Sequence, residues 1–282
     1  KKMNSYEIML SESQERMLVV IKKGNDKKLK EIFKKWDLNC KKIGQVTDTG
    51  CLEVLNGKEV VANIPVESLV LGGGAPQYDM PSSKPDYIEK LNTFDINSIK
   101  KTKKSFNNDL LKLLSSPNLT SKKYIYQQYD STVRTNTITG PGSDSAVIRL
   151  KKTSKALAIS TDCNGRYVYL DPINGARMAV AESARNVVCS GAQPLAITNC
   201  LNFGNPQDPE VYWQFKEAVI GMGDMCRELN TPVTGGNVSF YNETVKTAVF
   251  PTPVIGMVGL IENTKKITTM NYKNPDDFIV AI

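Results

Sequence analysis

The segment from Thr234 to Asn242 has the clearest chemical pattern in the sequence, two glycines followed by an asparagine and a serine. Gly235 and Gly236 would let the backbone approach a ligand closely. Asn237 and Ser239 are two residues apart, so on an extended chain they face the same side. An amide oxygen and a hydroxyl on one side suit magnesium and phosphate, although no Gly-Lys-Ser/Thr of a P-loop follows. A tight hairpin turn explains the segment nearly as well.

Two further polar segments directly follow apolar runs. The first, residues 161–166, carries the carboxylate of Asp162 together with an amide and an arginine. The second, residues 196–206, carries three asparagines, of which Asn199 is the first. Loops at the carboxyl ends of strands are where α/β sheets bind phosphate or metal. Ordinary polar turns, chosen for backbone geometry, are the alternative for both segments.

Residues 11–16 carry a polar pattern in which Ser11 and Gln14 fit the S-x-x-Q capping box of a helix start. From spacing alone, a helix cap is favoured over a ligand site.

The sequence contains no histidine, the commonest general acid or base and a frequent metal ligand. Any chemistry must therefore use carboxylates, amides and hydroxyls, or a histidine from elsewhere. The six cysteines include no C-x-x-C pair, which argues against zinc and against a redox motif.

The net charge of +7 comes from lysines dispersed in short groups among Asn, Asp and Glu. This distribution indicates a solvated surface, and nucleic acid is not expected as a partner. No run of about 18 apolar residues is present, so no membrane span is expected. The first residues lack the apolar stretch of a signal peptide, and we expect a cytoplasmic protein.

The first part of the chain reads as an α+β unit. We expect a strand over 17–22, a helix over 26–36, and a hairpin of strands 51–55 and 59–64 around the turn Asn56-Gly57. Residues 72–105 are rich in Gly, Pro, Ser, Lys and Asn and read as a domain boundary. Two short helices are expected near 108–114 and 122–129.

The second part alternates between strands and helices, which indicates an α/β domain. We expect strands near 156–161, 195–199, 232–234 and 248–260, and helices near 175–190 and 209–229. A last apolar strand over 278–282 would have no partner within the sequence, so the chain is expected to be an internal piece of a longer protein.

Six segments, taken in order, resemble the synthase subunit of the formylglycinamidine ribonucleotide synthase family, in its small, multi-subunit form. They are residues 11–17, Ser160–Pro172, Ala184–Gly191, Leu201–Pro206, Val211–Phe215 and Pro232–Ser239. The resemblance implies a fold of aminoimidazole-ribonucleotide-synthetase-like domains duplicated in the order first A, first B, second A, second B. Residues 1–75 would be the C-terminal half of the first B domain, 76–120 a linker and helical extension, 121–262 the second A domain, and 263–282 the opening strand of the second B domain.

The resemblance also implies the reaction, an ATP-dependent ligation that forms a C–N bond in purine biosynthesis. ATP phosphorylates the formamide oxygen of formylglycinamide ribonucleotide, giving an iminophosphate and ADP. Ammonia then displaces the phosphate to give formylglycinamidine ribonucleotide. The expected partners are the glutaminase subunit that supplies ammonia, a small adaptor subunit, and the remaining domains of the polypeptide.

The same resemblance assigns roles to individual residues. Glu12, Ser13 and Gln14 match a substrate-binding triplet and Ser239 a further substrate contact. Asn199 and Gly236 match ATP contacts, and Asn237 matches a ligand of Mg²⁺. At the position of Asn199 an aspartate is expected in several relatives. The catalytic histidine of the family is expected outside this chain, which alone should be inactive.

Two other readings remain open at this point. The chain could belong to another ATP-dependent enzyme of the same superfamily, such as aminoimidazole ribonucleotide synthetase, selenophosphate synthetase or thiamine-phosphate kinase. It could also be a non-catalytic module that holds a nucleotide for structural reasons only.

Overall fold

The computed structural model describes residues 2–13, 16–70, 73–74, 76–99, 106–245 and 247–280. The chain divides into two compact units, Lys1–Asp79 and Met80–Ile282.

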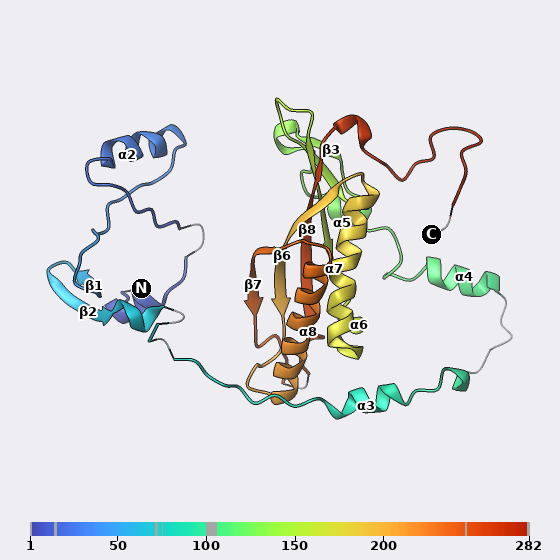
Figure 1. The fold of residues 1–282 in the computed structure, drawn as a ribbon, viewed down its shortest axis with the longest axis horizontal. Coiled ribbons are helices and arrows are strands. Elements are labelled where there is room, and N and C mark those ends of the chain that lie inside the picture. Colours follow the sequence, from blue (N-terminus) through green and yellow to red (C-terminus); the bar gives the residue numbers. More distant parts are fainter. Residues whose placement is uncertain are drawn as a thin grey trace. The chain divides into compact units, whose positions relative to one another are not determined.

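The first unit contains two helices and a hairpin (Figure 1). They are α1 (Ser5–Leu10), α2 (Asp26–Lys35), β1 (Cys51–Asn56) and β2 (Glu59–Pro65), followed by a 3-10 turn, η1 (Val66–Leu69). The two strands pair antiparallel, and Asn56 lies opposite Glu59 across the expected turn. Gly57 in that turn has φ +65°, which favours glycine. The predictions of the helix over 26–36 and of the hairpin are confirmed.

Two expectations for this unit are wrong. Residues 17–22 form no strand, because a strand needs a partner and none of the described segments pairs with them. Ser11 starts no helix and instead ends α1, donating from its backbone N–H to the carbonyl of Ile8. The capping box of α1 is formed seven residues earlier, by Asn4 and Glu7. Gln14 lies outside the described residues.

The first unit buries almost nothing of its own. None of its described residues is buried, and Met17 is 87% exposed and Ile43 is 82% exposed. Apolar side chains left in water forgo the main stabilising term of folding. By itself this unit therefore lacks a hydrophobic core.

The second unit is built on a six-stranded sheet in the order β3-β4-β5-β8-β6-β7. The strands are β3 (Thr137–Thr139), β4 (Ala146–Arg149), β5 (Ala156–Asp162), β6 (Gln193–Asn202), β7 (Val233–Ser239) and β8 (Thr252–Ile261). Strand β8 pairs antiparallel with both β5 and β6, and β6 pairs parallel with β7. Strands β5, β6 and β7 therefore run in the same direction.

Helices α7 (Pro172–Cys189) and α8 (Pro209–Glu228) cover one face of this sheet (Figure 1). Aspartates cap the start of both, Asp171 for α7 and Asp208 for α8, and a proline stands at the first helical position of each. The α/β fold and these two helices confirm the expectation. The short helix α6 (Gly165–Leu170) and strands β3 and β4 were not anticipated from the sequence.

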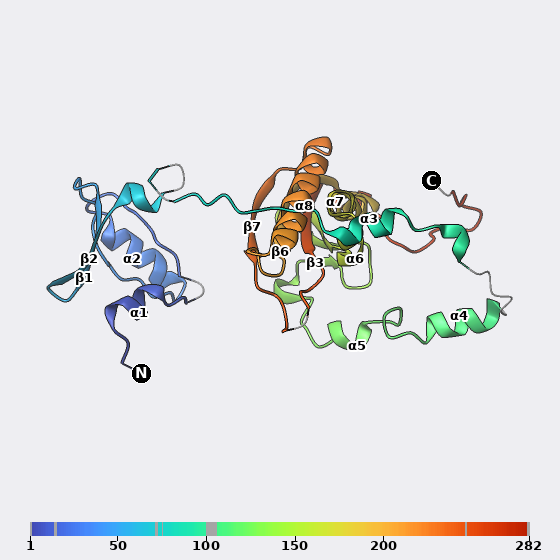
Figure 2. The same ribbon diagram turned by 90° about the horizontal axis from the view of Figure 1, so that it is seen from below.

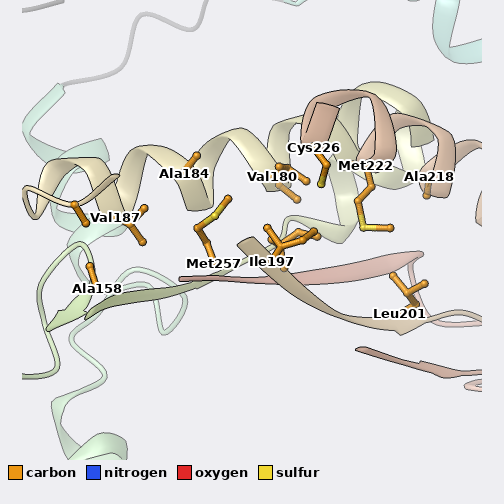
Figure 3. Close-up of a cluster of buried hydrophobic side chains, with 14 of the residues drawn as sticks. Ala158, Val180, Ala184, Val187, Ile197, Leu201, Ala218, Met222, Cys226 and Met257 are labelled. Atoms are coloured by element: carbon orange, nitrogen blue, oxygen red, sulfur yellow. The ribbon is translucent and has the colours of Figure 1, made fainter. Parts of the chain in front are cut away.

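The core lies between α7, α8 and the covered face of the sheet (Figure 3). Alternate residues of β8 are buried, among them Ile255 and Met257, while the intervening residues are half-exposed. Val180 and Val187 of α7 and Met222 of α8 pack against them. The opposite face of the sheet is not covered by any helix of the described residues of this unit.

Residues 81–92, which we call the strap, are fastened to the second unit. They include helix α3 (Asp86–Asn92) and pass the start of α8 and the end of α6 (Figure 2). Ser83 donates its N–H to the carbonyl of Pro209, and the Tyr87 hydroxyl donates to the carbonyl of Tyr169 at 2.9 Å. The rings of Tyr87 and Tyr169 stack with centroids 4.2 Å apart. The part of the expected linker that begins the second unit is thus a packed segment.

Beyond the strap, helices α4 (Phe106–Leu114) and α5 (Lys123–Tyr126) confirm the two short helices expected there, although α5 is shorter than predicted. Neither contains a buried residue. The expected strand over 278–282 is not formed by its described residues 278–280, and 281–282 lie outside them. Among the described helices, none has the length and apolar character needed to cross a membrane.

Candidate functional site

The carboxyl ends of β5, β6 and β7 meet at one edge of the sheet, because the three strands run in the same direction. The strands end at Asp162, Asn202 and Ser239. The sheet therefore brings together the polar segments that the sequence places after strands. This edge is where open α/β sheets bind their ligands.

Residue pairing between β6 and β7 decides which side chains share a face. Asn199 lies opposite Gly236, Cys200 opposite Asn237 and Asn202 opposite Ser239. Opposite residues of paired strands point to the same face, and successive residues alternate. Asn199 faces the helices, since its amide lies 3.5 Å from the sulfur of Met222 in α8. Asn237 and Ser239 consequently face the uncovered side.

The predicted site residues of this unit thus form two pairs on opposite faces of the sheet. Asn199 and Gly236 lie on the helix-covered face, whereas Asn237 and Ser239 lie on the uncovered face. The tight hairpin turn considered for residues 234–242 is excluded, because residues 234–239 belong to strand β7 and this strand pairs with β6.

Gly236 and Asn199 are in direct contact. A Cβ atom added at Gly236 would collide with the side-chain oxygen of Asn199 and lie 2.6 Å from its carbonyl oxygen. Any side chain at position 236 would have to displace Asn199. The glycine is therefore required by close approach, while Gly235 beside it has nothing within 4 Å of such a Cβ atom.

Asn237 presents a free carboxamide on the uncovered face. Its side chain is exposed, and no hydrogen bond to another described residue is formed by it. A neutral amide oxygen is an acceptable but weak ligand for Mg²⁺, which prefers hard oxygen donors. No group of three or more His, Cys, Asp or Glu able to hold a metal occurs among the described residues. The site fits Mg²⁺ only if phosphate or other carboxylates supply the remaining oxygens.

Ser239 is held by a residue to which the sequence analysis gave no role, Asn242. The amide nitrogen of Asn242 lies 2.8 Å from the carbonyl oxygen of Ser239, 3.0 Å from its hydroxyl and 3.1 Å from the carbonyl oxygen of Phe203. The serine hydroxyl in turn lies 3.3 Å from the Asn242 side-chain oxygen. The only sequence signal was that Asn242 ends the polar segment after β7.

The loops that follow β6 and β7 are joined by backbone hydrogen bonds. Phe203 donates to the carbonyl of Ser239, and Tyr241 donates to the carbonyl of Gly204 at 2.9 Å. A Cβ atom at Gly204 would lie 2.8 Å from the Cβ of Ala248, which explains the glycine in the segment Leu201–Pro206. These bonds make the two loops one structural element.

Asp162, at the end of β5, is engaged by α7. Its two carboxylate oxygens accept hydrogen bonds from the hydroxyl of Ser183 at 2.7 Å and the amide of Asn186 at 2.9 Å. Burial raises the pKa of the neighbouring Cys163 thiol to about 11, with further contributions from Glu182 and Asp162. Cys163 is therefore a neutral thiol at physiological pH and no nucleophile.

Glu12 and Ser13 lie in the first unit, in an exposed segment without regular structure after α1. Gln14 is outside the described residues, so the geometry of the triplet stays a prediction.

In the second unit, a hollow of about 470 Å³ lies between residues 135 and 153 and beside Thr264. It is at the amino end of β5, the opposite edge from the candidate residues.

Residues 142–261 match the family model described as AIR synthase related protein, N-terminal domain, and residues 1–55 match the model of its C-terminal domain. These two stretches of the chain are therefore similar to AIR synthase related proteins. Three curated relatives are each a phosphoribosylformylglycinamidine synthase subunit PurL. They come from Chlorobium chlorochromatii (54% identical over 99% of this chain), Chlorobaculum tepidum (53% over 100%) and Alkaliphilus metalliredigens (51% over 98%). The predicted resemblance is confirmed, and the chain spans 37% of the length of each of these relatives.

Solved structures of PurL from Thermotoga maritima share this fold. The complex with ATP has a TM-score of 0.69 at 29% identity, covering 94% of this chain and 40% of that chain. The structure described as PurLQS has a TM-score of 0.71 at 29% identity, covering 94% of this chain and 41% of that chain. The complex with FGAR has a TM-score of 0.58 at 27% identity, covering 79% of this chain and 32% of that chain.

Proposed function

We propose that this chain is part of a synthase subunit that converts formylglycinamide ribonucleotide to formylglycinamidine ribonucleotide in purine biosynthesis. The observation that carries the proposal is the identity of 51–54% with PurL over 98–100% of the chain. Because the chain spans about 37% of those relatives, the activity would belong to a polypeptide of which it is a part.

The proposed domain arrangement is the duplicated A-B-A-B order of this family. Residues 1–75 would belong to the first B domain, 76–120 to the linker, 121–262 to the second A domain and 263–282 to the second B domain. Two observations support it. A C-terminal-type family model precedes an N-terminal-type model along the chain, and the first unit lacks a core of its own. The rest of the first B domain would supply that core.

In the proposed reaction, the formamide oxygen of the substrate attacks the terminal phosphorus of ATP and ADP leaves. Ammonia then adds to the iminophosphate carbon, the C–O bond breaks, and phosphate leaves with formation of the amidine. Proton transfer by histidine would have to come from other parts of the polypeptide, since this chain has none. The role of this chain's residues is to bind and orient.

The proposed roles follow the geometry of the carboxyl edge. Gly236 and Asn199, which are in contact on the helix-covered face, would contribute contacts to ATP. Asn237 would hold Mg²⁺, which neutralises phosphate charge when bound. Ser239, on the same face as Asn237, would contact the ribonucleotide. Complexes of PurL from T. maritima with ATP and with FGAR support both ligands.

A reconstituted assay tests the proposal. The full polypeptide containing this chain is incubated with formylglycinamide ribonucleotide, ATP, Mg²⁺ and ammonium, and ADP, phosphate and amidine product are measured. We expect the three products in equal amounts, and we expect glutamine to replace ammonium only when a glutaminase subunit and a small adaptor subunit are added. Hydrolysis of ATP without amidine would contradict the proposal.

The 282-residue chain alone should show no turnover, because the groups of an active site act as a unit and this chain contains no histidine. A nucleotide that stays bound through many turnovers of the full polypeptide would instead indicate a structural nucleotide site. Exchange of labelled nucleotide during turnover separates the two cases.

A further inference from the structure

Asn242 lies where the loop after β7 turns back against the loop after β6. Its backbone N–H donates to the carbonyl of Phe203 at 3.1 Å, and its carbonyl accepts from the N–H of Val249 at 2.9 Å. Tyr241 before it has φ +58°, an uncommon value for a residue other than glycine. The turn is therefore tight and fixed at both ends.

The orientation of the Asn242 carboxamide is determined by its neighbours. Two backbone carbonyl oxygens, of Ser239 and Phe203, lie 2.8 and 3.1 Å from the nitrogen end. The reversed orientation would put the amide oxygen against both carbonyl oxygens, so the nitrogen end must face them. The oxygen end then remains as an acceptor, 3.3 Å from the Ser239 hydroxyl.

This arrangement restricts the hydroxyl of Ser239. Besides the two backbone carbonyls, the Asn242 amide nitrogen has the Ser239 hydroxyl at 3.0 Å, and the hydroxyl in turn lies 3.3 Å from the amide oxygen. The carboxamide therefore holds the hydroxyl at both of its ends. A preorganised group binds a ligand with less loss of side-chain entropy than a free rotor does. The restriction matters for binding only if a ligand contacts Ser239.

We propose that Asn242 is a positioning residue of the substrate site, acting through Ser239. It fixes the serine hydroxyl on the uncovered face of the sheet and joins the β7 loop to the β6 loop, so that the hydroxyl meets an oxygen of the ribonucleotide. This inference rests on the proposed function, in which Ser239 contacts the substrate.

The test compares Ser239→Ala, Asn242→Ala and the double variant of the full polypeptide. If Asn242 acts through Ser239, each single variant raises the KM for the ribonucleotide by about tenfold, as expected for one lost hydrogen bond. The double variant raises it no further, because the two residues act as one unit. The KM for ATP stays within about twofold in all three.

Two more variants separate positioning from folding. Asn242→Asp keeps the shape and the acceptor but removes the amide donor, so it should match Asn242→Ala. Asn263→Ala is the matched control: Asn263 caps the 3-10 turn η4 (Thr264–Lys266) at the other edge of the sheet. It should change neither KM.

The outcomes distinguish this inference from the proposed function. If Ser239→Ala raises the ribonucleotide KM and Asn242→Ala lowers only the melting temperature and kcat, Asn242 is merely structural and the inference is wrong. If Ser239→Ala leaves that KM unchanged in an active enzyme, the inference and the proposed contact of Ser239 are both wrong, whereas the proposed reaction stands. If the wild type has no turnover, calorimetric titration with the ribonucleotide replaces KM. Equal loss of affinity in both variants then supports the inference, and unchanged affinity or no binding by the wild type contradicts it.

Discussion

At the scale of single residues, the candidate binding residues within and after β7 are amides and a hydroxyl. Asn237, Asn242 and Ser239 are all uncharged, and an asparagine can donate and accept at once without changing its protonation. Such groups can orient a substrate, but they cannot exchange protons with it near neutral pH. This chemistry suits a half-site that binds, with the acid and base supplied elsewhere.

The contact between Gly236 and Asn199 gives a stability prediction. Gly236→Ala should lower the melting temperature, since overpacking of this kind costs about 1–3 kcal/mol. The loss should be smaller in an Asn199→Ala background, where the colliding side-chain oxygen is gone but the carbonyl oxygen remains. Gly235→Ala is the control and should be nearly neutral, because its added Cβ meets nothing within 4 Å. If Gly236→Ala lowered the melting temperature equally in the wild-type and Asn199→Ala backgrounds, the contact between Gly236 and the Asn199 side chain would be contradicted.

Asn237 gives a prediction about magnesium. Asn237→Leu, similar in volume but without the oxygen, should lower turnover of the full polypeptide and shift its Mg²⁺ requirement to higher concentration. Asn237→Asp restores an oxygen and adds charge, so its requirement should return toward that of the wild type. Both changes are on an exposed side chain and should leave the melting temperature nearly unchanged. Magnesium titrations at saturating ATP and substrate check this, and coincident curves would refute the assignment.

At the scale of elements, the strap gives a prediction that depends on pH. Burial raises the pKa of Tyr87 from its usual 10.0 to about 12, a shift partly opposed by the hydrogen bond from Gln214. The protonated hydroxyl is thus favoured in the folded state. Its contribution to the free energy of unfolding is fully present below pH 10.0 and is lost as the pH rises through about 12.

Tyr87→Phe should therefore lower the free energy of unfolding by about 1 kcal/mol at neutral pH, through the lost hydrogen bonds to Tyr169 and Gln214. The difference from the wild type should narrow between pH 10.0 and about 12. Denaturant unfolding at several pH values measures it. Tyr124→Phe, which alters an 83% exposed ring, should show no difference at any pH. A difference in the free energy of unfolding between Tyr87→Phe and the wild type that widens with pH would contradict the burial of Tyr87.

Elements with strong local signals could be predicted from the sequence, and those decided by distant partners could not. The hairpin around Asn56-Gly57 and the helix over 209–229 carry their own turn, cap and periodicity. Residues 17–22 have strand-like composition, but no described segment pairs with them. The hydrogen bonds by which Asn242 holds Ser239 and joins the two loops were also not predicted, because one of them is made to Phe203, a residue of another loop.

The site residues illustrate the same limit. Spacing by two correctly predicted that Asn237 and Ser239 share a face, because alternation is local to one strand. It could not predict that Asn199 faces the opposite side, because that depends on the register between β6 and β7. Sequence reasoning therefore predicted that Asn237 and Ser239 share a face, but not that the sheet separates them from Asn199.

At the scale of the whole molecule, the two units differ in how much they bury. All residues of the main hydrophobic core belong to the second unit, whereas no described residue of the first unit is buried. Hydrophobic burial is the dominant stabilising term of folding. Stability measured on this chain should therefore report on the second unit, and the variants above are placed there for that reason.

The strap also has a consequence for synthesis on the ribosome. Tyr87 precedes its partner Gln214 by 127 residues. At about 5–20 residues per second, Gln214 is made roughly 6 to 25 s after Tyr87. The stacking partner Tyr169 is made within this interval, but the strap can form all of its contacts only after both α6 and α8 have folded. Each newly made copy therefore passes through a state in which the strap is open and accessible to chaperones and proteases.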